Sequence, residues 1–200
     1  MSFKDSNAQE VDEKLAALIT NSNAIRAVAS AVEGTIGPKG LDIMLVDRFG
    51  EVTITNDGVT ILKQMDVNHP AAKMLINIAK AQQEEVGDGT TTATIMAGAM
   101  VSEGVAQILR GVPVARIIEG INHGVKRAQE ILNSYTIPAS GIDDPALKKI
   151  ALIAGREHED IAELVFEAGK LIGREKLSEE IFKLKDVIKS RVGADNEVFM

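Results

Sequence analysis

The sequence contains no cysteine and no tryptophan, and aromatic residues make up only 3% of its 200 positions. The absence of cysteine excludes disulfide bonds, thiol catalysis and cysteine-based zinc sites. With so few aromatic residues, a core has to be built from Ala, Val, Ile, Leu and Met, which suits packed helices. Apolar residues nevertheless form 45% of the chain, so the composition is that of a globular protein.

Basic residues are also scarce relative to acidic ones. The chain has 22 Lys and Arg against 29 Asp and Glu, a net charge of −7. This balance argues against nucleic acid as the main partner, because phosphate backbones are bound by basic faces. The longest uncharged run, between Asp88 and Glu103, is shorter than the roughly 18 apolar residues of a membrane span. The polar N-terminus lacks the apolar stretch of a signal peptide, so we predict a cytoplasmic protein that binds no membrane.

Helical periodicity dominates the chain. Apolar residues recur three and four positions apart, which predicts helices over residues 11–33, 70–86, 90–110, 114–135, 145–153 and 158–173. A short helix is also expected from Gly58 to about Met65. Two apolar or β-branched runs flank Asp47–Gly50 and predict a β-hairpin. The predicted fold class is therefore mainly α: a helical bundle through about residue 135, with an inserted β-hairpin.

A domain boundary is predicted at residues 137–145, a stretch rich in Pro, Gly, Ser and Asp. Beyond the two helices that follow it, residues 181–200 have strand character, which predicts part of an α+β domain. The sequence stops at Met200 on an apolar run with no closing turn. Because an apolar strand is seldom left without a partner strand, we interpret this as an incomplete end.

Three polar loops interrupt the predicted bundle: TIGPKG at residues 35–40, TNDG at 55–58 and GDGTTT at 87–92. The third loop begins a helix, whose first-turn N–H groups are unpaired and attract anions. Gly87 and Gly89 allow a phosphate to approach the backbone closely, and the three threonines add hydroxyl donors. Asp88 would repel a phosphate unless a cation lies between them, and Mg²⁺ binds through one or two carboxylates plus phosphate oxygens.

Each of these features also has a purely structural explanation. Thr90 can be a helix cap and the glycines around it a turn. Asp57 could orient water or contact a metal, or it could simply end a hairpin strand in an Asn-Asp-Gly turn. Lys39 could meet a phosphate or be solvated. The loops match neither the P-loop pattern nor the Rossmann glycine pattern, and the three histidines show no metal-ligand spacing.

Taken together, four segments resemble the chaperonins. They are TIGPKG, MLVD, VTITNDGVTILKQMDVNHPAAKML and EVGDGTTTATIMAG, in this order and spacing. The NDG and MDVNHPAAK segments are similar to the thermosome type, which is group II and includes the group II-like chaperonins of some bacteria. The resemblance is dense over residues 11–135 and looser to 200. It implies an ATP-driven folding machine, in which subunits form two stacked rings that enclose unfolded protein.

The resemblance also implies roles for individual residues. Asp88 would bind Mg²⁺, and Asp57 would help to activate the attacking water. The residues implied to bind ATP are Thr35, Gly37, Pro38, Gly89, Thr90, Thr91 and Thr92. A phosphate-sensing lysine is often found near residue 155 in thermosome-type chaperonins, and here Arg156 stands in that loop. A guanidinium binds phosphate as a planar fork rather than as a point charge.

Family subunits are more than twice as long as this sequence. The resemblance implies that residues 1–138 are the N-terminal half of the equatorial, ATP-binding domain. Residues 139–200 would be the ascending segment of the intermediate domain, which reaches the start of an apical domain that the sequence does not contain. Two other interpretations remain: a truncated, non-catalytic piece or interaction module that docks on complete rings, and a small ATPase that acts alone.

Overall fold

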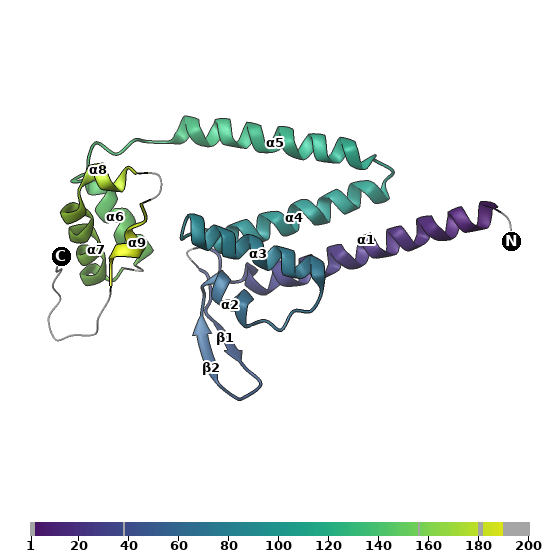
Figure 1. Ribbon diagram of the computed structural model, residues 1–200, viewed down its shortest axis with the longest axis horizontal. Coiled ribbons are helices and arrows are strands. Elements are labelled where there is room, and N and C mark those ends of the chain that lie inside the picture. Colours follow the sequence, from purple (N-terminus) through teal and green to yellow (C-terminus); the bar gives the residue numbers. More distant parts are fainter. Residues whose placement is uncertain (1–2, 38, 156, 180–181, 190–200) are drawn as a thin grey trace. The chain divides into compact units, whose positions relative to one another are not determined.

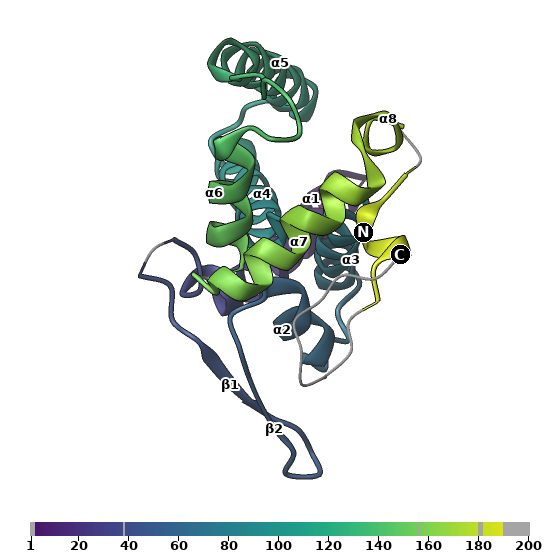
Figure 2. The same cartoon turned by 90° about the vertical axis from the view of Figure 1, so that its left-hand side faces the viewer.

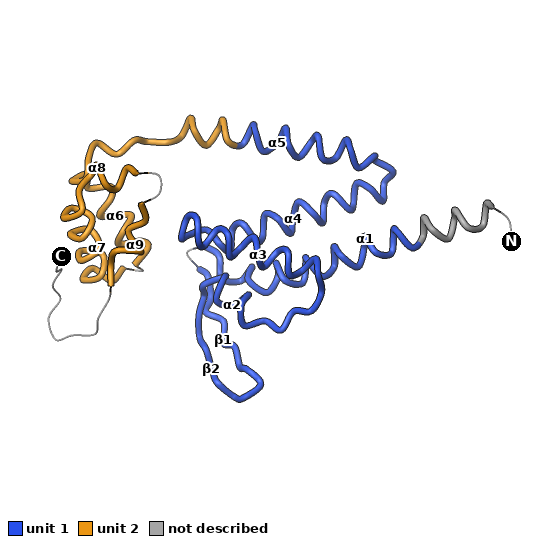
Figure 3. The backbone as a smooth tube through the Cα atoms, viewed as in Figure 1, with its two compact units in different colours: residues 1–128 blue, residues 129–200 orange. Residues whose placement is uncertain are grey.

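The computed structural model of the protein describes residues 3–37, 39–155, 157–179 and 182–189 (Figure 1). The chain forms two compact units, residues 1–128 and residues 129–200 (Figure 3). The division falls inside helix α5 (Val114–Tyr135), whereas the composition predicts a boundary shortly after this helix.

The first unit is built mainly of helices, as the periodicity predicts. Its elements are α1 (Phe3–Glu33), β1 (Ile43–Val46), β2 (Val52–Thr55), α2 (Gly58–Gln64), α3 (Pro70–Glu85), α4 (Thr90–Leu109) and most of α5. Pro70 opens α3 in the first turn, where a missing N–H leaves no helical hydrogen bond unmade. The predicted bounds are confirmed within about two residues, apart from α1, which begins earlier than the apolar pattern indicates.

One apolar core joins α1, α2 and α3. Val32 of α1 and the neighbouring pair Ile61 and Leu62 of α2 are at most 1% exposed. On α3, the buried residues Ala72, Leu75, Ile76 and Ala79 follow the spacing of a single helix face. Burying a side chain the size of leucine is worth about 1.5–3 kcal/mol, so this cluster holds the three helices together.

Helices α1 and α4 pack closely and run in opposite directions (Figure 1). Gly98 of α4 lies against Ala29 of α1, and a β-carbon added at Gly98 would stand 2.7 Å from the β-carbon of Ala29. That distance is well below ordinary contact, so the two backbones can approach this closely only because residue 98 has no side chain.

The predicted hairpin is confirmed. Strands β1 and β2 pair antiparallel, with Met44 opposite Ile54, and the hairpin projects from the helices (Figures 1 and 2). The carboxylate of Asp47 closes the turn by accepting the N–H groups of Phe49 and Glu51, each at 2.8 Å. Side chains alternate between exposed and half-buried along both strands, as expected for a sheet with one covered face.

Helix α5 differs from the predicted bundle, because none of its residues is buried. Its large apolar side chains recur on one stripe of the helix yet remain exposed; they are Ile118, Ile121, Val125 and Leu132. The amphipathic pattern correctly predicts a helix here, but periodicity alone cannot show whether a partner covers the apolar face.

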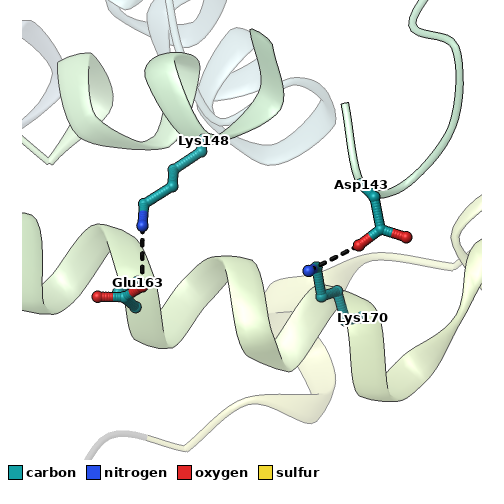
Figure 4. Close-up of polar contacts among 4 residues, drawn as sticks. All are labelled: Asp143, Lys148, Glu163 and Lys170. Atoms are coloured by element: carbon teal, nitrogen blue, oxygen red, sulfur yellow. Dashed lines mark hydrogen bonds and ion pairs between the residues drawn. The ribbon is translucent and has the colours of Figure 1, made fainter. Parts of the chain in front are cut away.

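In the second unit, α6 (Pro145–Ala154) packs against α7 (Glu159–Ile172). Two ion pairs accompany this packing, Lys148 with Glu163 at 2.8 Å and Lys170 with Asp143 at 2.6 Å (Figure 4). The hydrogen bond between Lys148 and Glu163, together with their opposite charges, raises the lysine pKa and lowers the glutamate pKa. Both pairs are largely exposed, so each contributes little to stability.

The strand character predicted for residues 181–200 is wrong where the structure describes that segment. After α8 (Arg174–Leu177), residues Leu184–Val187 form the short helix α9. No strand lies beside them in the described part of the second unit. A strand needs a neighbour to satisfy its backbone groups, and a helical turn satisfies them locally. Residues 180–181 and 190–200 lie outside the described residues.

Two helices among the described residues are long and apolar enough to cross a membrane, judged by length and composition alone: Glu13–Glu33 of α1 and the whole of α4. This is weak support for a membrane span, because core helices of globular proteins pass the same test. In this structure the two helices pack against each other. The expectation that the chain binds no membrane therefore stays a prediction.

Candidate functional site

The geometry of α1 and α4 brings two of the three polar loops to the same end of the first unit. From the contact between Ala29 and Gly98, the chain runs along α1 toward Thr35, just past its end, and α4 runs back to Thr90 in the same direction, because the helices are antiparallel. At 1.5 Å per residue, the two loops begin about 9 Å and about 12 Å beyond that contact. They therefore lie at similar heights along the helix pair.

The loop after α1 is folded tightly onto itself. Thr35 is 9% exposed, and its hydroxyl donates to the carbonyl of Val32 at 2.8 Å. The N–H of Gly40 donates to the carbonyl of Gly37, which has a left-handed backbone with φ of 83°. The Thr35 hydroxyl proton is thus engaged at the end of α1. A ligand could contact exposed Gly37 and the loop backbone here. Pro38 lies outside the described residues.

Asp57 lies two positions after the end of β2, at the base of the hairpin, and it caps α2. Its Oδ2 accepts both the N–H of Thr60 at 3.0 Å and the hydroxyl of Thr60 at 2.6 Å. Its own N–H donates to the hydroxyl of Thr55 at 3.1 Å. Within the described residues no group donates to Oδ1, so the half-buried carboxylate has one oxygen engaged and one available.

The loop that carries Asp57 lies directly against the first turn of α4. A β-carbon added at Gly58 would stand 3.2 Å from both the Cα and the N of Thr91, and would clash with the Thr91 hydroxyl. This contact brings the second and third polar loops together, although 33 positions separate the two residues in the sequence. An aspartate and an unpaired helix start are therefore neighbours in the structure.

Asp88 lies between two glycines with left-handed backbones, Gly87 with φ of 86° and Gly89 with φ of 74°. Its side chain is exposed, and Oδ1 accepts the N–H of Gly89 at 2.7 Å. Gly89 is the N-cap of α4 and provides no side-chain hydrogen bond to the first turn. The N–H groups of this turn therefore depend on a partner other than a capping side chain.

The three threonines of the loop are placed differently from one another. Thr90 is only 5% exposed, and its carbonyl accepts the hydroxyl of Thr94 at 2.8 Å. Thr91 is half-buried beside Gly58, and Thr92 is exposed. The hydroxyls of Thr91 and Thr92 could thus donate hydrogen bonds to a bound anion, whereas Thr90 could donate only through its backbone N–H.

The carboxylates, N–H groups and hydroxyls at this end of the unit fit a phosphate that arrives with a bound cation. Asp88 offers an exposed carboxylate and Asp57 a free oxygen, next to N–H and hydroxyl donors. No group of three or more His, Asp or Glu side chains in the described residues could hold a metal by itself. Mg²⁺ fits such a site because it retains waters and shares phosphate oxygens rather than requiring a protein cage.

Two residues of this region were missed by sequence reasoning. Thr60 orients the Asp57 carboxylate, and Gln82 of α3 donates its Nε2 to the carbonyl of Asp88 at 2.9 Å. A threonine three positions after a capping aspartate is a recognisable local signal. The sequence gives no such signal for Gln82, because its hydrogen bond to the Asp88 carbonyl depends on where α3 ends. Lys39 is exposed, and Arg156 lies outside the described residues.

Comparison with known proteins agrees with the predicted class, a chaperonin. A sequence model of the TCP-1/cpn60 chaperonin family matches residues 28–198. Thermosome subunit beta of Archaeoglobus fulgidus is 48% identical over 161 residues, which cover 78% of this chain and 30% of that protein. The thermosome subunit of Pyrococcus horikoshii is 43% identical over 162 residues, again covering 78% and 30%.

A solved structure gives the same result. The crystal structure of a group III chaperonin in the open state has a TM-score of 0.81 and 49% identity, and it covers 92% of this chain and 37% of that one. The protein belongs to the TCP-1/cpn60 chaperonin family. It spans about 30% of the length of the curated relatives that it matches.

Proposed function

We propose that this chain carries the Mg-ATP site of a chaperonin subunit. Hydrolysis of ATP there would drive closure of a ring chamber around unfolded protein. The observation that carries the proposal is the contact between Gly58 and Thr91, because it places Asp57 beside the first turn of α4. Membership of the chaperonin family also supports the proposal. In addition, all three loops that resemble chaperonin motifs belong to the same compact unit.

The residues divide the chemistry between binding and turnover. The first-turn N–H groups of α4 and the hydroxyls of Thr91 and Thr92 would bind the phosphate oxygens. Asp88 would hold Mg²⁺, which when bound neutralises charge on those oxygens. Asp57 would accept a hydrogen bond from a water through Oδ1 and orient it toward the γ-phosphorus, while Thr60 fixes Oδ2. Such positioning is the main source of rate enhancement in phosphoryl transfer.

The test is to compare Asp88→Asn and Asp57→Asn by calorimetric titration with ATP, with and without Mg²⁺. Asp88→Asn is expected to lose the magnesium-dependent part of binding. Asp57→Asn is expected to bind Mg-ATP normally and, in the subunit as the cell produces it, to turn over about 10²–10⁴-fold more slowly. Asp66→Asn is the matched control, because Asp66 is an exposed aspartate outside the three loops.

Equal loss of binding in the Asp88 and Asp57 variants would refute this division of roles. Failure of the unsubstituted protein to bind Mg-ATP would refute the proposed function itself. The binding of Thr35, Gly37, Pro38, Gly89 and Thr90 to the nucleotide is part of the same proposal.

One observation favours a second candidate, an interaction module that docks on complete chaperonin rings. The apolar stripe of α5 is exposed along its length, and such a stripe is suited to contact with another protein. Light scattering of the native particle, isolated with Mg-ATP, separates the two. A large ring of subunits longer than this chain supports the ATPase proposal. A small assembly of 200-residue chains supports the docking module or a small ATPase, and hydrolysis by a monomer would identify the latter.

We propose the remaining assignments on the basis of family membership. Residues 1–138 would belong to the equatorial domain, and residues 139–200 to the intermediate domain. The partners would be other chaperonin subunits, in a homo- or hetero-oligomeric double ring, and unfolded proteins. Neither nucleic acid nor a membrane is expected to bind, and a cytoplasmic location is expected.

A further inference from the structure

Gln82 contacts both the end of α3 and the loop that carries Asp88. Its backbone carbonyl accepts the N–H groups of Val86 at 3.0 Å and Gly87 at 3.1 Å, which end α3. Its side-chain Nε2 donates to the carbonyl of Asp88 at 2.9 Å. The same Nε2 is the nearest neighbour of a β-carbon added at Gly89, at 3.4 Å. The backbone carbonyl and the side chain of Gln82 together thus link the end of α3 to the residues that precede α4.

The hydrogen bond to the Asp88 carbonyl controls more than one atom. The carbonyl of Asp88 and the N–H of Gly89 belong to the same planar peptide unit, so fixing one fixes the direction of the other. That N–H donates to Oδ1 of Asp88 at 2.7 Å. The brace from Gln82 therefore sets where the Asp88 carboxylate lies and how α4 begins.

Such a brace has a physical reason at this position. Asp88 lies between glycines with φ of 86° and 74°, and glycine adopts many backbone conformations at little cost. Rotation of the Asp88–Gly89 peptide would otherwise be easy, and it would turn the Gly89 N–H away from the carboxylate. In the described residues, Gln82 is the side chain from outside the loop that hydrogen-bonds this peptide unit.

We propose that Gln82 is a positioning residue of this site: its amide holds the Asp88–Gly89 peptide so that Asp88 and the first turn of α4 keep the geometry that binds Mg²⁺ and phosphate. This inference rests on the proposed function. It adds to it a residue on α3 that touches no ligand and acts through the backbone of the loop.

The test uses two substitutions of equal charge at neighbouring positions, Gln82→Glu and Gln83→Glu, in the full chain. A carboxylate at position 82 cannot donate to the Asp88 carbonyl, whereas Gln83 makes no hydrogen bond to the loop. Because this hydrogen bond is lost, we expect the Kd for Mg-ATP to rise about tenfold in Gln82→Glu. ATP binding in EDTA should change much less. Gln83→Glu should bind both like the unsubstituted protein.

Two further measurements separate positioning from a general loss of structure. Gln82→Met removes the donor while it keeps length and helix propensity, and it should weaken Mg-ATP binding without lowering the melting temperature beyond that of Gln83→Glu. Hydrogen exchange of the Gly89 amide should speed up in both Gln82 variants. Equal Kd values in the Gln82 and Gln83 variants would overturn the inference and leave the proposed function intact. Absence of Mg-ATP binding in the unsubstituted protein would overturn both.

Discussion

Gly58 and Thr91 are in direct contact, and a β-carbon added at Gly58 would lie 3.2 Å from the backbone N and Cα of Thr91. The contact joins the start of α2 to the start of α4. It is tighter than side chains normally tolerate, so these two helix starts can be neighbours only because residue 58 is glycine.

We therefore expect Gly58→Ala to separate the Asp57 loop from α4. Overpacking of this kind costs about 1–3 kcal/mol of the free energy of unfolding, although alanine is the better helix former. Urea unfolding measures this loss, and Mg-ATP titration should show weaker binding. Gly120→Ala is the control, because nothing lies within 4 Å of a β-carbon there. It should be neutral or stabilising, and a similar loss in both variants would contradict the contact.

Thr60 should govern turnover rather than nucleotide binding. Thr60→Val removes the hydroxyl that donates to Asp57 Oδ2 but keeps the backbone N–H through which Asp57 caps α2. We expect kcat for ATP hydrolysis to fall by about 10- to 150-fold, the value of one hydrogen bond to a charged group, with the Kd for Mg-ATP unchanged. Thr60→Ser restores the hydroxyl and should recover the rate. A valine variant whose Kd rises while kcat is preserved would assign Thr60 a different role.

Helix α5 should contribute little to the stability of the first unit. Ile118→Ala is expected to change the free energy of unfolding by less than about 0.5 kcal/mol, as for other exposed sites. Ile61→Ala should cost about 2–5 kcal/mol, because Ile61 is 1% exposed, whereas Ile118 is 54% exposed. Denaturant unfolding of dilute protein gives both values. Comparable losses would show that α5 packs against a partner, and light scattering of the same samples would show whether that partner is another copy.

The stability of the first turn of α6 should depend on pH. Hydrogen bonds from the backbone and hydroxyl of Ser140 and from the backbone of Ala146 lower the pKa of Asp144. A carboxylate whose pKa is lower in the folded state adds stability above its unfolded pKa and loses it as pH falls through the folded value. The loss is therefore expected below about pH 4, the ordinary range of an aspartate.

Circular dichroism of Asp144→Asn from pH 7 to pH 2 checks this expectation. Asparagine also caps helices but does not titrate, so the variant should lose less helix on acidification than the unsubstituted protein. Glu163, whose pKa the Lys148 hydrogen bond lowers, contributes in the same direction and remains titratable in the variant. Identical acid transitions in the two proteins would show that the Asp144 hydrogen bonds do not affect stability.

Local features of the protein were predictable from the sequence because neighbouring residues produce them. The spacing of apolar residues indicated α3 and α4, Pro70 marked the first turn of α3, and Asp47–Gly50 indicated the hairpin turn. The order of the loop motifs indicated the chaperonin family, and the family comparison confirmed it.

Long-range contacts decided the rest. The sequence pattern treats Thr90, Thr91 and Thr92 alike, yet packing buries Thr90 and leaves Thr92 exposed. The strand character predicted for residues 181–200 is wrong at Leu184–Val187, which are helical. A strand requires a neighbour to complete its hydrogen bonds, and the described part of the second unit supplies none.

The sequence by itself determined which residues are the candidates for binding phosphate and Mg²⁺, because side-chain chemistry and helix-start signals are local properties. Only the tertiary structure placed Gly58 against Thr91 and Gln82 against Asp88. Those contacts depend on how closely backbones approach and where a preceding helix ends. Such distances are set by the packing of α1, α2, α3 and α4 around a shared core, which no single segment encodes.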